Sequence, residues 1–165
     1  MNKTEFKAQV LEYSNAIDQD TDWVSGSEWL RESARAIDSY LTDNNEDYNL
    51  PKIVASLESL TIRDYFMGVM DKDNPTHRWR ISLMVDSVPI NYASAPACYF
   101  SLLAFEGGNN SLALSRLDKA KQNYPLAILL KRVYLAEWDS NSFSDMRKEL
   151  HPKVCTTIFG ESVMA

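Results

Sequence analysis

The chain has 165 residues and a net charge of −6 at pH 7, and 45% of its residues are hydrophobic against 24% charged. This is the composition of a globular domain long enough to bury a core, while only five glycines disfavour a turn-rich all-β fold and a glycine-rich nucleotide loop. No apolar run approaches the roughly 18 residues of a membrane span, and the polar, acidic start does not support secretion by a signal peptide. We therefore expect a cytoplasmic protein with no membrane partner and with reduced thiols at Cys98 and Cys155.

The first 60 residues predict three helices. Apolar residues at helical spacing indicate a helix over Thr4–Ile17 with Thr4 as its cap, which the segment 18–26 interrupts. Ser27 suits the N-cap of a second helix, one face of which carries Trp29, Leu30, Ala34, Ile37 and Leu41. The polar run 42–48 predicts a loop, and Pro51 stands where a proline opens a third helix.

The middle of the chain continues this helical pattern. A short helix is expected over Ile62–Met70, followed by a turn over 71–76. A further helix carries Trp79, Ile81, Met84 and Val88 and ends before Pro89. The segment 95–105 is apolar on nearly every side, which in a short helix predicts burial on several faces.

The last third predicts two clear helices and a weak end. Asn109 or Asn110 caps a helix in which Ala113, Leu117, Ala120 and Tyr124 share one face, and Pro125 opens the next helix, which runs through Tyr134. Beyond Asp139 the signal weakens to a helix over 143–150 and a frayed tail. No segment alternates with period two, so we predict a single all-α domain, a helical bundle of about eight helices.

The segment 97–125 has the spacing of a tetratricopeptide-like helical hairpin. Its turn, small and bulky positions are Gly108, Ala113, Leu117, Ala120 and Pro125. No second copy follows one period later, and stacked repeats need about three copies for stability. The face that would bind a peptide carries Cys98, Leu102 and Phe105, so we expect other helices of the chain to cover it.

An ordered series of motifs over 61–146 is similar to an uncharacterised, mainly actinobacterial family that is known only as a domain of unknown function. The series comprises Arg63-Asp64, Asp73-Asn74-Pro75, Arg78-Trp79, Ala95-Pro96-Ala97, Gly107-Gly108, the spaced Ala113, Leu117 and Ala120, and the stretch 124–130. The resemblance covers about half of the chain. It implies a family-like helical core over 61–146, preceded by an acidic helical extension over 1–60 and followed by a tail over 147–165, and it implies no activity.

The charge of the chain is concentrated at its N-terminal end. Residues 1–60 contain 5 basic and 12 acidic side chains, a net charge of −7, and the remainder contains 12 basic and 11 acidic side chains, a net charge of +1. An acidic surface repels phosphate, and we recognise no Lys/Arg stripe in the remainder. Direct binding of nucleic acid is therefore disfavoured.

Three alternating carboxylates, Asp18, Asp20 and Asp22, open like a calcium-binding loop. Such a loop needs glycine at its sixth position and glutamate at its twelfth, where this chain has Trp23 and Trp29. We therefore interpret the carboxylates as a solvated acidic linker.

The remaining candidate chemistry does not assemble a metal or cofactor site. His77 and His151 are the only histidines. Cys155 follows His151 by four residues, but Pro152 between them disfavours a helix holding both, and a zinc site needs three or four ligands. We expect surface or capping roles for the two histidines and an inert, buried thiol at Cys98.

Arg63 and Asp64 form the one polar pair that the resemblance emphasises. Among the apolar neighbours Ile62, Tyr65 and Phe66, a structural role in fixing how helices meet is favoured over catalysis.

The function that these observations favour is non-catalytic binding of another protein. The candidate contact residues are the acidic Asp18, Asp20 and Asp22 and three aromatic residues expected to be exposed, Trp23, Trp29 and Tyr48. One alternative is a small hydrolase or transferase with a site around Arg63, Asp64 and His77. Another is an acidic mimic of DNA that blocks a DNA-binding protein.

Overall fold

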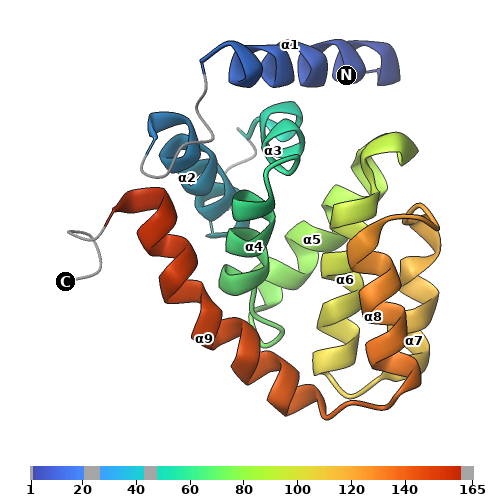
Figure 1. The fold of residues 1–165 in the computed structure, drawn as a ribbon. Helices are drawn as coiled ribbons and strands as arrows, with labels where there is room; N and C mark the ends of the chain where they lie inside the picture. The colour runs from blue at the N-terminus through green and yellow to red at the C-terminus, as the bar shows by residue number, and fades with distance from the viewer. Residues whose placement is uncertain (1, 21–26, 43–47, 161–165) are drawn as a thin grey trace. The chain divides into compact units, whose positions relative to one another are not determined.

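The computed structural model describes residues 2–20, 27–42 and 48–160, and the side chains of these residues except 17–20. Within these ranges every regular element is a helix, nine of them α-helices (Figure 1), which confirms the all-α prediction. The chain forms two compact units: the N-terminal unit comprises Met1–Val69 and Lys148–Ala165, and the central unit comprises Met70–Arg147.

The boundary between the units differs from the predicted division after residue 60. Residues 61–69, which the resemblance assigns to the core, lie in the helix Leu60–Val69, and this helix belongs to the N-terminal unit. The single-domain organisation stays a prediction.

Four helices and the later turns of a fifth build the N-terminal unit. They are α1 (Lys3–Asp20), α2 (Glu28–Thr42), α3 (Leu50–Ser56), α4 (Leu60–Val69) and the C-terminal part of α9 (Ser140–Phe159). Helix α1 packs on α3, and α2 packs on both α3 and α4. The predicted apolar face of α2 is buried along its whole length.

The ends of these helices test the predicted caps. The Ser27 hydroxyl accepts the Leu30 amide of α2, as predicted. Thr4 is not the cap of α1, because the Asn2 side chain accepts the Glu5 amide at 2.8 Å and donates to the Glu5 carboxylate at 3.1 Å. Asn2 is therefore the N-cap of α1, and its side-chain amide also bonds to the Glu5 side chain. The predicted break at Asp18 is also wrong, because α1 continues to Asp20.

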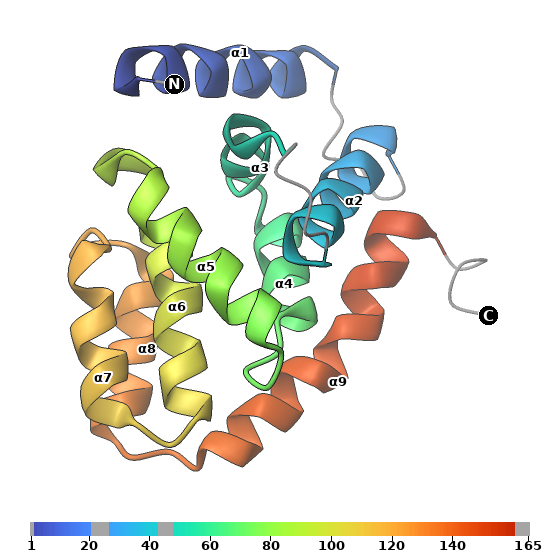
Figure 2. The same cartoon turned by 180° about the vertical axis from the view of Figure 1, so that it is seen from behind.

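The central unit contains the remaining helices. They are α5 (Pro75–Ser87), a 3₁₀ turn η1 (Ile90–Tyr92), α6 (Ser94–Glu106), α7 (Asn110–Arg116), a second 3₁₀ turn η2 (Leu117–Lys119), α8 (Pro125–Leu135) and the start of α9. Helix α6 packs against α5, α7 and α8 (Figures 1 and 2). Apart from Phe100, every residue of α6 is buried.

Helices α6 and α7 form a close hairpin around the Gly107-Gly108 turn. Gly108 has φ of +86°, a conformation that glycine adopts at little cost. Ala113 is fully buried, and the Ser101 hydroxyl on α6 donates to the Ala113 carbonyl at 2.7 Å. Cys98, Leu102 and Phe105 are also fully buried, which confirms that the chain itself covers this face.

The second helix of this hairpin is shorter than predicted. Helix α7 ends at Arg116 and passes into η2, and Ala120 is extended with φ of −82° and ψ of 146°. The Lys121 amide, just beyond, donates to the Ser94 hydroxyl at the start of α6. The predicted helical face through Tyr124 is therefore wrong, and the tetratricopeptide likeness stays a prediction.

The C-terminal segment also differs from the prediction. In place of a helix over 143–150 and a frayed tail, α9 runs unbroken from Ser140 to Phe159 with Pro152 inside it. A proline in a helix interior costs about 3 kcal/mol. Tertiary packing offsets this cost, because Ile158 is fully buried and the ring of Phe159 contacts that of Tyr65 within the N-terminal unit.

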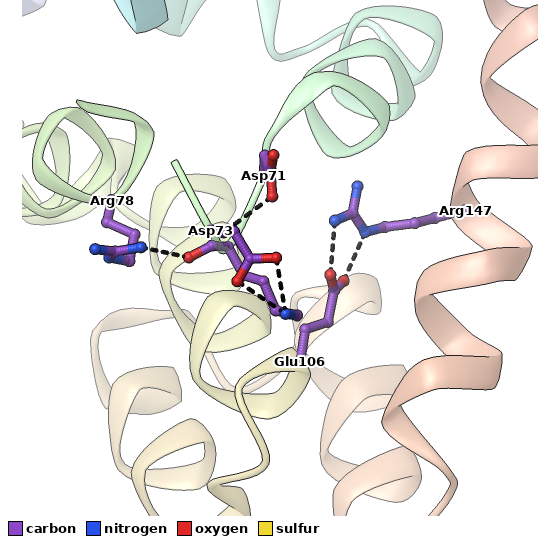
Figure 3. A network of polar contacts seen from close by, with 6 residues as sticks. Asp71, Asp73, Arg78, Glu106 and Arg147 are labelled. Atoms are coloured by element: carbon purple, nitrogen blue, oxygen red, sulfur yellow. Dashed lines mark hydrogen bonds and ion pairs between the residues drawn. The ribbon is translucent and has the colours of Figure 1, made fainter. Parts of the chain in front are cut away.

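A buried ion pair joins α6 to α9 inside the central unit. The Arg147 guanidinium donates to both oxygens of Glu106, at 2.6 Å each, and the two side chains are only 4% and 1% exposed (Figure 3). A bidentate pair of this kind is strong and geometrically specific. It ties the first turns of α9 to the C-terminal end of α6.

Breaking this pair on one side should destabilise the protein. We expect Glu106→Gln to lower the free energy of unfolding by about 3 kcal/mol or more, because the Arg147 charge stays buried without its carboxylate. The double variant E106L/R147M should recover most of the loss. Urea unfolding monitored by circular dichroism measures both.

The exposed pair Lys119–Asp86 supplies the matched control. Asp86→Asn should change the free energy of unfolding by no more than about 0.5 kcal/mol, since exposed pairs contribute little. A Glu106→Gln variant as stable as Asp86→Asn would contradict the importance of the buried pair.

A candidate peptide-binding groove

A groove of about 610 Å³ lies on the central unit between two segments that are adjacent in both views (Figures 1 and 2). One side is formed by α7, η2 and the residues that follow η2, and the other by α8. The lining residues are Leu114, Leu117, Asp118, Ala120, Lys121, Gln122, Ala127, Ile128, Lys131, Arg132 and Leu135.

Helix α8 supplies one wall because it carries two stripes. Its first stripe (Ala127, Leu130, Val133 and Tyr134) is buried within the unit. The second stripe, Ile128, Lys131, Arg132 and Leu135, has the spacing i, i+3, i+4, i+7 and faces the groove. Ile128 is 38% exposed and Leu135 is 65% exposed.

The opposite wall has the same spacing. Leu114, Leu117, Asp118 and Lys121 also fall at i, i+3, i+4 and i+7, and all four line the groove. The hydrogen bond from the Lys121 amide to the Ser94 hydroxyl holds this end of the wall on α6. Each wall therefore presents two large apolar side chains together with charged ones.

The groove lies in the basic part of an acidic protein. Residues 110–135 carry five Lys/Arg and one Asp, a net charge of +4, against −6 for the whole chain. Two of the cations have partners: Lys119 contacts Asp86, and Arg116 donates to the Phe100 carbonyl and stacks on its ring. The other three, Lys121, Lys131 and Arg132, line the groove. These three cations come from two separate segments of the chain, so the sequence shows no Lys/Arg stripe although they line one groove.

The interaction residues predicted near the N-terminus are not shown to form a surface. Trp29 is buried at 9% exposure, so the prediction of an exposed aromatic residue is wrong there. Tyr48 is half-buried, with its ring edge-on to that of Tyr40. Asp18 and Asp20 belong to the end of α1, but their side chains, like Asp22 and Trp23, lie outside the described residues.

The residues of the predicted hydrolase site lie in different units. Arg63 and Asp64 are half-buried on α4. Burial raises the pKa of the Asp64 carboxyl above its usual value, and the nearby Arg63 charge offsets only part of this rise. His77 is on α5 in the central unit. It is buried rather than at the surface, and its Nδ1 accepts the Asp71 amide at 3.1 Å.

That hydrogen bond helps to explain the turn before α5 in structural terms. Asn74 caps the helix by accepting the amides of Thr76 and His77, with Pro75 in the first turn. Arg78 donates to the Lys72 carbonyl (Figure 3). These motif residues therefore shape and close a turn.

A second cluster of polar side chains lies in the N-terminal unit. Contrary to the prediction, His151 and Cys155 share α9, with Nε2 of the histidine 3.4 Å from the thiol sulfur. The ring of His151 contacts that of Tyr65, the hydroxyl of which donates to the Asp38 carboxylate at 2.8 Å.

This cluster does not have the features of an activated nucleophile. Burial and the Asp38 carboxylate raise the pKa of the Cys155 thiol, whereas a nucleophilic cysteine needs a lowered one. Burial and the hydrogen bond to Asp38 likewise raise the pKa of Tyr65. The arrangement links α2, α4 and α9 within the N-terminal unit.

The described part of the chain contains no group of three or more His, Cys, Asp or Glu side chains placed to hold a metal ion. None of its helices is long and apolar enough to cross a membrane. No family model, curated protein or solved structure matches the chain significantly. The actinobacterial resemblance therefore stays a prediction.

The groove wall on α8 has a pattern in the sequence that is missed when only one apolar face of the helix is sought. In the segment 125–135, apolar residues occupy two faces, although lysine and arginine on the second face show that it meets water. A helix with one apolar stripe hides it in the core. The second stripe at Ile128 and Leu135 instead lines the groove and stays partly exposed.

The two cysteines should differ in reactivity. Cys98 is fully buried, which raises the pKa of its thiol to about 12, while Cys155 is half-buried. Because the thiolate is the reactive form, iodoacetamide should label Cys155 alone in the folded protein. The rate should still rise through pH 9, since the pKa of Cys155 lies above its usual value of 9.0.

Mass spectrometry of native and urea-unfolded samples measures this difference. Cys155→Ser should remove the native label, and Cys98→Ser should leave it. Native labelling of Cys98 at the same rate as Cys155, or a Cys155 rate that levels off below about pH 8, would contradict the expectation.

Gly68 on α4 leaves the space that His151 occupies. A Cβ at this glycine would lie 2.2 Å from Nδ1 of His151. We expect Gly68→Ala to destabilise the protein by about 1–3 kcal/mol through overpacking. In a His151→Ala background the same change should cost clearly less, because the imidazole is gone and only the Cβ of residue 151, 3.1 Å from the added Cβ, remains close.

Thermal unfolding of the four proteins completes this double-mutant cycle. If Gly68→Ala had the same effect in both backgrounds, the contact between Gly68 and His151 would not determine the packing.

Proposed function

We propose that this protein is a non-catalytic interaction module that binds a partner protein in the groove between α7 and α8. The observation that supports this most is the second stripe of α8, where Ile128 and Leu135 remain exposed beside a hollow. Both side chains line the same hollow, and hollows lined by apolar side chains with a few polar groups are common binding sites on proteins.

The turn after α8 carries a further large exposed side chain. Trp138 follows Leu135 by three residues and is 55% exposed. Exposed tryptophan is among the commonest anchors of protein interfaces. The proposed contact surface thus moves from the acidic N-terminal region, where the sequence suggested it, to the central unit.

The alternatives receive less support from the described residues. The hydrolase or transferase reading relied on His77, which is buried and accepts a backbone amide. The DNA-mimic reading relied on acidic side chains of residues 1–60, and several of these lie outside the described residues.

Site-specific photocrosslinking in the native cell tests the proposal. Benzoylphenylalanine replaces Ile128 in the groove and, as a matched control, Ile90, which is 60% exposed on η1. We expect position 128 to capture a defined protein that position 90 does not capture. The same product should be lost when Leu135→Asp is added, since a carboxylate removes apolar contact area.

Equal patterns of crosslinked proteins from the two positions, or a product that survives Leu135→Asp, would refute the groove as the interface. The circular dichroism spectrum and thermal midpoint of the Leu135→Asp variant should equal those of the parent, because Leu135 is exposed.

A further inference from the structure

We propose that the groove binds an acidic amphipathic helix of the partner protein. This inference rests on the proposed function and names the chemistry of what the groove receives. It is drawn from three features of the groove: its walls, the aliphatic character of its lining, and the cations that border it.

The walls favour a helix as the ligand. The α8 wall and the part of the other wall formed by α7 and η2 are helical, so their backbone groups bond along the chain and offer no strand edge to which an extended peptide could be added. A ligand lying there must satisfy its own backbone hydrogen bonds, which a helix does. On α8 the i, i+3, i+4, i+7 spacing forms a helical ridge on which a further helix can pack.

The lining disfavours two other kinds of ligand. Proline-rich segments dock in grooves lined by aromatic rings, and single-stranded nucleic acids stack their bases on such rings. The eleven lining residues include no aromatic side chain. The apolar contacts instead come from leucine, isoleucine and alanine, which suit the aliphatic stripe of an amphipathic helix.

The charges of the lining residues favour a partner with an acidic contact surface. Lys121, Lys131 and Arg132 line the groove with Asp118 as the only acidic residue, a net charge of +2. Among the described residues, none of these three cations forms an ion pair. Carboxylates flanking the apolar stripe of a partner helix would pair with them, which speeds association and sets orientation.

Two synthetic peptides test the inference on the full-length protein. Both are helices of about 18 residues with leucine at i, i+3, i+4 and i+7. The polar positions next to the stripe are glutamate in one peptide and lysine in the other. Fluorescence anisotropy measures the dissociation constants at about 50 mM and about 300 mM salt.

We expect the glutamate peptide to bind at least about tenfold more tightly than the lysine peptide at low salt, with a smaller difference at high salt. The variant K131E/R132E should bind the lysine peptide more tightly than the glutamate peptide. The variant I128D/L135D should bind both peptides more weakly than the parent does. The control K148E/K153E changes the net charge equally at exposed positions outside the groove and should leave the preference unchanged.

Several results would overturn the inference. Equal or tighter binding of the lysine peptide would do so, as would a preference that K131E/R132E leaves intact. Tighter binding of a single-stranded oligonucleotide would identify a nucleic-acid site. Concentration-dependent dimerisation abolished by I128D/L135D would identify a second copy as the occupant.

The photocrosslinking experiment separates this inference from the proposed function. A captured segment that is basic, or that is not helical, would refute the acidic helix while leaving the groove as an interface. Absence of a specific product at position 128 would refute both.

Discussion

Helix α6 imposes the constraint on which the central unit depends. Twelve of its thirteen residues are buried, and most of them are apolar. Such a helix is stable only when other elements cover every side. Helices α5, α7 and α8 do so, and the buried Glu106 at its end is matched by Arg147 of α9.

The groove follows from the way this cover is completed. Helix α7 uses Ala113 to approach α6 closely and then ends early, so that η2 and the residues after it lie against the start of α6. Helix α8 buries one stripe within the unit, and its second stripe lines the groove. The walls of the groove are the outward sides of elements whose inward sides make the core.

The polar groups of the protein serve mainly to fix its backbone. Asn74, His77 and Arg78 close the turn before α5, and Tyr65 joins α4 to Asp38 of α2. The raised pKa values of Cys98 and Cys155 describe thiols kept protonated by burial. The three groove cations are the polar side chains for which an external partner offers the clearest role.

Local pattern in the sequence determined the all-helical class, the cap at Ser27, the buried face of α2 and the burial of α6, because each depends on residues a few positions apart. It could not determine where α7 ends, that α9 continues past Pro152, or that Trp29 is buried. Those outcomes depend on contacts with residues far away in the chain, such as Ser94 for Lys121 and Tyr65 for Phe159. The groove likewise depends on contacts between residues that are distant in the sequence. The residues of each wall lie within a short segment of the sequence. Only tertiary packing places the two segments side by side with a groove between them.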